Sequence, residues 1–233
     1  MGALGHNTSA VYLSLIDGKV VRRFKEPTQH SKPRTITKGV NTGKVIHEEH
    51  YDYIQGWIKD IKVKLPNDPS YGKTWIVTFL DDDGSEYVLQ MDYSSGYSSA
   101  FLKTLPNIDF SNKVKISPTM KLENEKKKVG MFINQNGKWL KSFFTKDHPN
   151  GLPQMKKLIV KGKEVWDDTE MMAFLEKMVN NDVLPLLTKS AGERTSSTAH
   201  IDQSMQNDID NLQEEHMDDR GAPPPTENDD LPF

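Results

Sequence analysis

The fold of this chain is decided by residues 51–65, which read Tyr51-Asp52-Tyr53-Ile54-Gln55-Gly56-Trp57-Ile58-Lys59-Asp60-Ile61-Lys62-Val63-Lys64-Leu65. Polar and apolar residues alternate along most of this stretch, which is typical of a half-buried β-strand. Gly56 lies near its centre, and a glycine inside a strand indicates a bend or a bulge. We therefore expect one long strand here, bent or bulged at Gly56.

Further strand patterns follow this stretch on both sides of one short helix pattern. Three dipeptides that favour tight hairpins separate apolar runs: Asp17-Gly18, Asp83-Gly84 and Asn136-Gly137. The expected strands after residue 65 span 75–80, 87–93, 114–117, 120–122, 128–133 and 139–144, with a helix over 98–105 that ends at Pro106. Three strands, a helix and further strands is the order of an OB-fold, a five-stranded Greek-key barrel, although other small barrels and sandwiches give similar patterns.

The rest of the chain predicts additions to this mainly β barrel. Residues 11–16 and 20–24 indicate a hairpin, and 26–45 a loop or arm, so that 1–46 form an N-terminal hairpin and arm. A C-terminal helix is expected to begin at a capping box of Asp167 and Glu170, with one apolar face made of Met171, Phe174, Leu175 and Met178. The OB-fold domain with this helix then spans 47–187, and polar residues make 188–233 a disordered acidic tail.

Charge divides the chain more sharply than its net charge of −3 suggests. Residues 1–187 hold 27 Lys and Arg against 22 Asp and Glu, whereas residues 188–233 hold 3 against 11. A basic body with an acidic tail is typical of a polyanion-binding domain, although both could be ordinary solvated surfaces. The chain has no cysteine, no signal-peptide pattern and no apolar run long enough for a membrane span, so we expect a cytoplasmic protein without membrane attachment.

Lysines and aromatic residues occur together on the expected strands. Binding of single strands needs cations for phosphates and flat rings on which bases stack. The candidate DNA-binding residues are Tyr53, Trp57, Lys59, Lys62, Lys64, Lys113, Lys115, Lys126, Lys127, Lys128, Trp139, Lys141 and Phe143. The competing interpretation is that the rings fill the barrel; it applies most strongly to Trp57, Trp75, Phe79, Tyr87, Phe132 and Phe144.

Motifs for metal binding and catalysis are weak. His47-Glu48-Glu49-His50 lacks the spacing of a helical zinc motif, and Asp81-Asp82-Asp83-Gly84 does not complete a calcium loop. The sequence has no phosphate-binding loop, dinucleotide fingerprint or nucleophile elbow. We therefore expect a protein that is not an enzyme and uses neither a cofactor nor a metal.

The last residues of the sequence combine carboxylates with an apolar tip. Asp229, Asp230, Leu231, Pro232 and Phe233 follow a Pro-rich polar stretch, and the ring and terminal carboxylate of Phe233 would suit an apolar pocket bordered by Arg or Lys. An ordinary disordered terminus is the alternative. We expect these five residues to bind partner proteins.

This tip resembles the acidic tip of bacterial single-stranded DNA-binding proteins, which ends in aspartates followed by Ile-Pro-Phe. The resemblance implies an OB-fold that coats single strands and a tip that recruits replication, recombination and repair enzymes. Similar tails ending in Phe occur on phage single-stranded DNA-binding proteins, where the tail also shields the DNA groove. The body is longer than that of the bacterial proteins and lacks their Gly/Gln-rich linker, so the resemblance favours a phage-encoded relative in a bacterial host cytoplasm.

The sequence therefore predicts sequence-tolerant binding and protection of single-stranded DNA in replication, recombination and repair, with partner enzymes recruited by the tip. A homo-oligomer is compatible with it. The alternative is a β-barrel replisome adaptor that binds proteins but not DNA; a nucleic-acid enzyme has less support. Residues 1–46 could form an independent element, a dimer contact or an extension around the barrel.

Overall fold

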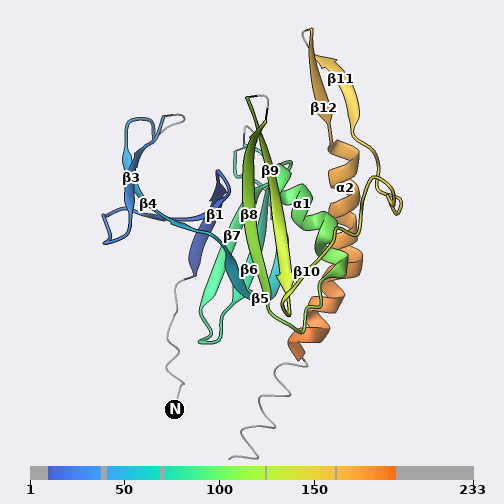
Figure 1. Ribbon diagram of the computed structural model, residues 1–233, viewed down its shortest axis with the longest axis horizontal. Helices are drawn as coiled ribbons and strands as arrows, with labels where there is room; N and C mark the ends of the chain where they lie inside the picture. Colours follow the sequence, from blue (N-terminus) through green and yellow to red (C-terminus); the bar gives the residue numbers. More distant parts are fainter. Residues whose placement is uncertain (1–9, 38–40, 69–70, 124, 161, 193–233) are drawn as a thin grey trace, which may run out of the picture. The chain divides into compact units, whose positions relative to one another are not determined.

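The computed structural model describes residues 10–37, 41–68, 71–123, 125–160 and 162–192 (Figure 1). The chain divides into residues 1–191 and residues 192–233, and only Gly192 of the second unit is among the described residues. The strands of the first half are β1 (Val11–Ile16), β2 (Lys19–Phe24), β3 (Lys32–Thr35), β4 (Val45–Tyr51), β5 (Ile54–Lys64), β6 (Thr74–Leu80) and β7 (Glu86–Asp92). Then come α1 (Gly96–Thr104), the 3₁₀ turn η1 (Leu105–Asn107), β8 (Val114–Glu123), β9 (Lys126–Gln135), β10 (Lys138–Trp139), β11 (Lys156–Val160), β12 (Lys163–Asp167), α2 (Thr169–Met178) and the π-helical η2 (Val179–Val183).

The prediction of a mainly β fold is confirmed, but the sheet is larger than a five-stranded barrel. Ten strands of the described chain form one mixed sheet in the order β10-β9-β8-β5-β6-β7-β1-β2-β4-β3. Neighbours pair antiparallel except β1 and β7, which are parallel. Among the described residues, no pairing joins the two end strands, β10 and β3, so the sheet is not closed.

Two of the three predicted tight turns are confirmed. Asp17 and Gly18, with φ of 47° and 78°, connect β1 to β2, and Asn136 and Gly137, with φ of 52° and 77°, connect β9 to β10. Positive φ at both central residues is required by the hairpin turn that matches the twist of the strands, which explains the choice of Asp or Asn followed by Gly. Gly84 lies instead in a five-residue connection between Leu80 and Glu86.

The long strand expected over 51–65 is divided in two. Tyr51 ends β4, the chain bends at Asp52, and β5 begins at Ile54. A bulge at Gly56 is also wrong, because the register shift with β6 falls between Ile58 and Asp60. Gly56 has a different reason to be glycine: a Cβ built on it would lie 2.7 Å from the backbone oxygen of Leu80.

Three other strand predictions need correction. Residues 32–35, expected in a loop or arm, form β3 on β4. Residues 114–123 make one continuous strand, because Pro118 still pairs in register with Met131. The strand expected over 139–144 ends at Trp139, since the backbone N–H of Phe143 turns to the carbonyl of Lys103, at 2.8 Å.

The core lies between the sheet and the helices. Ile58, Trp75, Phe79 and Ile116 from the sheet pack with Phe101 of α1 and Leu175 of α2, all nearly inaccessible to solvent. Figure 1 shows α1 beside β9 and α2 alongside α1. At about 25 cal/mol per Å² of apolar area, burial of such large side chains is the main stabilising term of the fold.

The C-terminal helix lies where the sequence predicts it, but its beginning and end differ. Met171, Leu175 and Met178 are buried and Phe174 is partly buried, which confirms the predicted face. The capping box is absent: Asp167 accepts from the backbone and hydroxyl of Thr169, and Glu170 forms an ion pair with Lys156. Helical backbone continues to Gly192, so residues 188–192 are not part of a disordered tail.

Candidate nucleic-acid interface

Aromatic and lysine side chains gather on the solvent side of β5, β8, β9 and β10. Gln55, Lys115, Asn134 and Trp139 lie in one row across these four strands. Paired residues of neighbouring strands project from the same side of a sheet. The alternation along each strand then gives a shared surface, here called the aromatic–lysine face, made of Tyr53, Trp57, Lys113, Lys115, Phe132 and Trp139.

The rings of this face are accessible to a ligand. The side chains of Tyr53, Phe132 and Trp139 are 48%, 58% and 59% exposed, and Trp57 is half-buried. Phe132 meets Trp139 edge to face, with ring centroids 5.8 Å apart and planes at 66°. Phe132 and Trp139 therefore form adjoining exposed apolar surface, which makes this face a candidate binding surface.

Two lysines lie directly over rings of the face. The Nζ of Lys115 is 3.8 Å from the ring centroid of Tyr53, and the Nζ of Lys113 is 4.5 Å from that of Trp57. Lys113 also forms an ion pair with Asp82. Such cation–π contacts keep positive charge beside flat apolar surface, which is what a base with its phosphate requires.

A bulge in β5 extends the face with three more lysines. After the register shift at Lys59, Lys62 and Lys64 pair with Ile76 and Thr74, and Ile61 and Val63 point to the core side. Strict alternation from Trp57 would have put Lys62 and Lys64 on the opposite side. The bulge therefore places all three lysines, Lys59, Lys62 and Lys64, on the side of Trp57.

The lysines at the far end of β9 divide between the two sides. The register places Lys126 and Lys128 on the side of Phe132, where Lys128 lies 2.6 Å from Glu123. Lys127 projects from the other side and lies 2.5 Å from Asp17. The triple lysine is thus not a single cluster of charge.

Lys141 and Phe143 lie away from the face. The carbonyl of Lys141 accepts from Asn107 Nδ2 at 2.8 Å, next to η1. The ring of Phe143 stands edge-on to Phe144, with centroids 4.9 Å apart, and Phe144 is in the core. The predicted group of Trp139, Lys141 and Phe143 on one strand face does not exist, because the strand ends at Trp139.

Phe132 is another residue that the sequence interpretation placed wrongly. It was expected in the core with Trp75, Phe79 and Phe144; these three are buried, whereas Phe132 is exposed. The sequence contained a signal: Phe132 and Ile133 are adjacent apolar residues, and two neighbours in a strand point to opposite sides, so only one of them could face the core. In the structure that residue is Ile133, which is 1% exposed.

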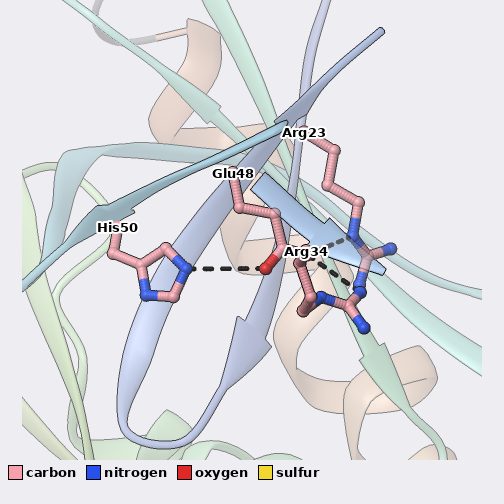
Figure 2. A network of polar contacts seen from close by, with 4 residues as sticks. All are labelled: Arg23, Arg34, Glu48 and His50. Carbon is pink, nitrogen blue, oxygen red and sulfur yellow. Dashed lines mark hydrogen bonds and ion pairs between the residues drawn. The ribbon is translucent and has the colours of Figure 1, made fainter. Parts of the chain in front are cut away.

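In the His47-Glu48-Glu49-His50 stretch, Glu48 is the centre of a network of ion pairs. Glu48 is 2% exposed and lies between Arg34 at 2.9 Å, Arg23 at 3.2 Å and His50 at 3.5 Å (Figure 2). Burial raises the pKa of Glu48, but the hydrogen bonds and charges of Arg34 and Arg23 outweigh burial and hold the pKa below its ordinary value. Among the described residues, no three His, Cys, Asp or Glu side chains form a group that could hold a metal ion.

Comparison of the chain with protein-family models, curated proteins and solved structures finds no match. Within the described part of the chain, neither helix has the length and apolar character to cross a lipid bilayer.

Proposed function

We propose that this protein binds single-stranded DNA with little sequence preference and protects it during replication, recombination or repair, without acting as an enzyme. The observation that carries the proposal is the aromatic–lysine face, where three exposed rings and a half-buried tryptophan lie beside Lys113 and Lys115.

Stacking supplies affinity without selecting a sequence, because every base has a flat face. One stacked base contributes about 1–3 kcal/mol. Tyr53, Phe132 and Trp139 together would contribute about 3–9 kcal/mol, and because association costs a similar amount of free energy, the phosphate contacts of the lysines are needed as well. The four bases differ little in this contact, which favours coating over recognition of a site.

Phosphates can replace the acidic partners of the surface lysines. Lys59 pairs with Glu86 and Lys62 with Asp60, whereas Lys115 has no ion pair among the described residues. Exposed ion pairs are worth at most about 1 kcal/mol, so exchange of a carboxylate for a phosphate costs little. Binding through these lysines should weaken as salt rises.

The strand order supports an OB-related origin of the body. β5, β6 and β7 precede α1, and β8 and β9 follow it, which is the order expected of that barrel. In this proposal the β1–β2 hairpin is inserted beside β7, where a smaller barrel would close.

The tip residues Asp229, Asp230, Leu231, Pro232 and Phe233 lie outside the described residues. Their resemblance to the tip of single-stranded DNA-binding proteins supports a proposed role in recruiting replication and recombination proteins. It also supports the proposed phage origin.

Titration of the full chain with oligothymidine, followed by tryptophan fluorescence at two salt concentrations, tests the proposal. Quenching that saturates and weakens with salt is expected. Equal affinity for a duplex of the same length, or no quenching at low salt, would refute it.

The replisome adaptor remains a second candidate because of the β11–β12 hairpin. This separate two-stranded sheet leads into α2 (Figure 1). Its side chains Ile159 and Trp166 are 78% and 60% exposed. Exposed apolar side chains on a hairpin fit a protein partner. An adaptor would keep its partners in pull-down experiments and show no binding of oligothymidine.

A further inference from the structure

A pocket of about 230 Å³ lies at the edge of the aromatic–lysine face, where β4 turns into β5. Buried Leu13, Val20 and Ile54 line its apolar part. Tyr51 and Tyr53, on either side of the bend at Asp52, form part of its wall, so the pocket shares Tyr53 with the face.

The N-terminal hairpin creates this pocket. Val20 of β2 pairs with Tyr51 of β4, and Val11 of β1 pairs with Tyr87 of β7. Paired residues lie on the same side of a sheet, so Tyr51 and Tyr87 stand beside the apolar residues of β1 and β2. A body without residues 1–46 would lack this pocket.

The pocket wall contains three tyrosine rings whose faces are not stacked on other aromatic rings of the described residues. Among the described residues, Tyr51, Tyr53 and Tyr87 contact no other aromatic ring; Tyr53 has Lys115 over it, and the hydroxyl of Tyr51 donates to Glu49. Three tyrosines around an apolar pocket of this size suit one flat heterocycle. The volume is small for a drug-sized ligand and is sufficient for one base.

A cation and two hydrogen-bonding groups border the same pocket. Arg22 is half-buried, and its guanidinium lies 4.7 Å from the ring of Phe24. It pairs in register with Glu49 and helps to lower the pKa of that carboxyl, but it forms no ion pair among the described residues, so a phosphate can still bind it. Asp81 and Gln55 also line the pocket. One oxygen of Asp81 accepts from the N–H of Asp82, which leaves the other oxygen as an acceptor. A carboxylate acceptor suits the amino group of cytosine and has no amino partner on thymine.

We propose that this pocket holds one nucleotide of the bound strand, with its base between the tyrosines and its phosphate at Arg22, and that it prefers cytosine to thymine. The inference rests on the proposed function and adds to it one position along the strand that reads the base.

Mononucleotides test the pocket independently of the face. Binding of deoxycytidine 5′-monophosphate, thymidine 5′-monophosphate and deoxyribose 5-phosphate to the full chain is measured by NMR titration. We expect the cytidine nucleotide to bind at least about threefold more tightly than the thymidine nucleotide, and deoxyribose 5-phosphate to bind most weakly. Cytidine nucleotide that binds no more tightly than deoxyribose 5-phosphate would overturn the proposal.

Variants assign the contacts. Tyr87→Leu should weaken cytidine nucleotide binding about tenfold, Arg22→Gln should weaken both nucleotides equally, and Asp81→Asn should remove the preference for cytosine. Trp166→Leu, on the β11–β12 hairpin, serves as the control and should change none of these values. If Tyr87→Leu unfolds the chain, the other two variants decide: unchanged binding in both overturns the proposal.

Oligothymidine titrated in parallel separates the two proposals. Oligothymidine binding without mononucleotide binding overturns the pocket alone. Mononucleotide binding without oligothymidine binding overturns the proposed function and leaves a nucleotide site. Absence of both overturns both.

Discussion

Trp139 is the side chain most directly responsible for the proposed stacking. It is 59% exposed, lies in one row with Lys115 and Asn134, and is held at its edge by Phe132. Because the protein itself covers little of the ring, a base can stack on it without rearrangement of the core. Its removal should affect binding and leave folding nearly unchanged.

Trp139→Leu should lower the affinity for oligothymidine by roughly 5- to 150-fold, which corresponds to about 1–3 kcal/mol for one lost stack. Fluorescence anisotropy of labelled oligothymidine measures the change. Trp166→Leu is the matched control, because Trp166 is equally exposed, at 60%, but lies on the β11–β12 hairpin. Similar losses in both variants would contradict the assignment of the face.

Glu48 has a structural role that a change of pH should reveal. Its pKa is below the ordinary value in the folded state because Arg34 and Arg23 stabilise the carboxylate more than burial disfavours it. The stabilisation is therefore fully present above the unfolded pKa and is lost as pH falls through the lowered folded pKa. Glu48→Gln should reduce the free energy of unfolding by about 1.5–3 kcal/mol at pH 7, the value of hydrogen bonds to a charged group.

Urea unfolding of Glu48→Gln and the unchanged chain at pH 7 and near pH 3 measures this effect. We expect the difference between them to shrink at the lower pH. Glu164→Gln, at an exposed ion pair with Lys157, should change stability by less than about 0.5 kcal/mol at either pH. If the difference in the free energy of unfolding between Glu48→Gln and the unchanged chain grew on acidification, the direction assigned to the pKa shift of Glu48 would be wrong.

At the scale of elements, the close approach of β5 and β6 at Gly56 explains one glycine of the long strand. A Cβ at this position would meet the backbone oxygen of Leu80 at 2.7 Å, and neighbouring strands cannot yield without a loss of packing. Gly56→Ala should lower the free energy of unfolding by about 1–3 kcal/mol. Gly72→Ala is the control, because nothing lies within 4 Å of its added Cβ.

Thermal unfolding of both glycine variants tests this prediction. If Gly56→Ala were as stable as Gly72→Ala, β5 and β6 would have to separate more easily than the pairing of Trp57 with Leu80 indicates.

Local patterns predicted several elements well because their causes are local. The Asp17-Gly18 and Asn136-Gly137 turns need only the backbone freedom of two residues, and α1 needs only its apolar spacing and Pro106. The bulge at Lys59 has no such signal, since any residue can occupy it. Its consequence, the placement of Lys62 and Lys64 beside Trp57, could not be derived from strict alternation.

The end of β10 is a second feature that a local sequence pattern could not predict. The pattern of Trp139 to Phe144 alternates as a strand would, and the exposures of these residues do alternate. The backbone of Phe143 nevertheless bonds to Lys103 of α1 instead of continuing along β9. A partner 40 residues away decides the path, and a pattern within six residues cannot contain it.

For the whole molecule, the pairing of β1 with β7 changes the expected barrel into an open sheet. These strands are parallel and distant in sequence, so neither a hairpin turn nor a local pattern indicates their contact. The pairing also brings residues of the N-terminal hairpin beside Tyr51 and Tyr87. The sequence predicted this hairpin but left open whether it is an independent element, a dimer contact or an extension around the barrel. An N-terminal element that is part of the main sheet cannot be removed without exposing the core around Leu13 and Val20.

The charge of the whole chain gives the last prediction. Residues 193–233 carry 2 Lys and Arg against 11 Asp and Glu, so a chain that ends at Gly192 changes from a net charge of −3 to +6. A polyanion is attracted more strongly to the truncated chain over distances within the Debye length, which is about 10 Å at 0.1 M salt. The truncated chain should bind oligothymidine at least about threefold more tightly at low salt, and the gain should vanish near 1 M salt because the charges are then screened. A control with Asp and Glu of residues 193–233 changed to Asn and Gln keeps the length and should reproduce the gain; a loss of DNA binding in either variant would contradict the placement of the DNA site on the aromatic–lysine face.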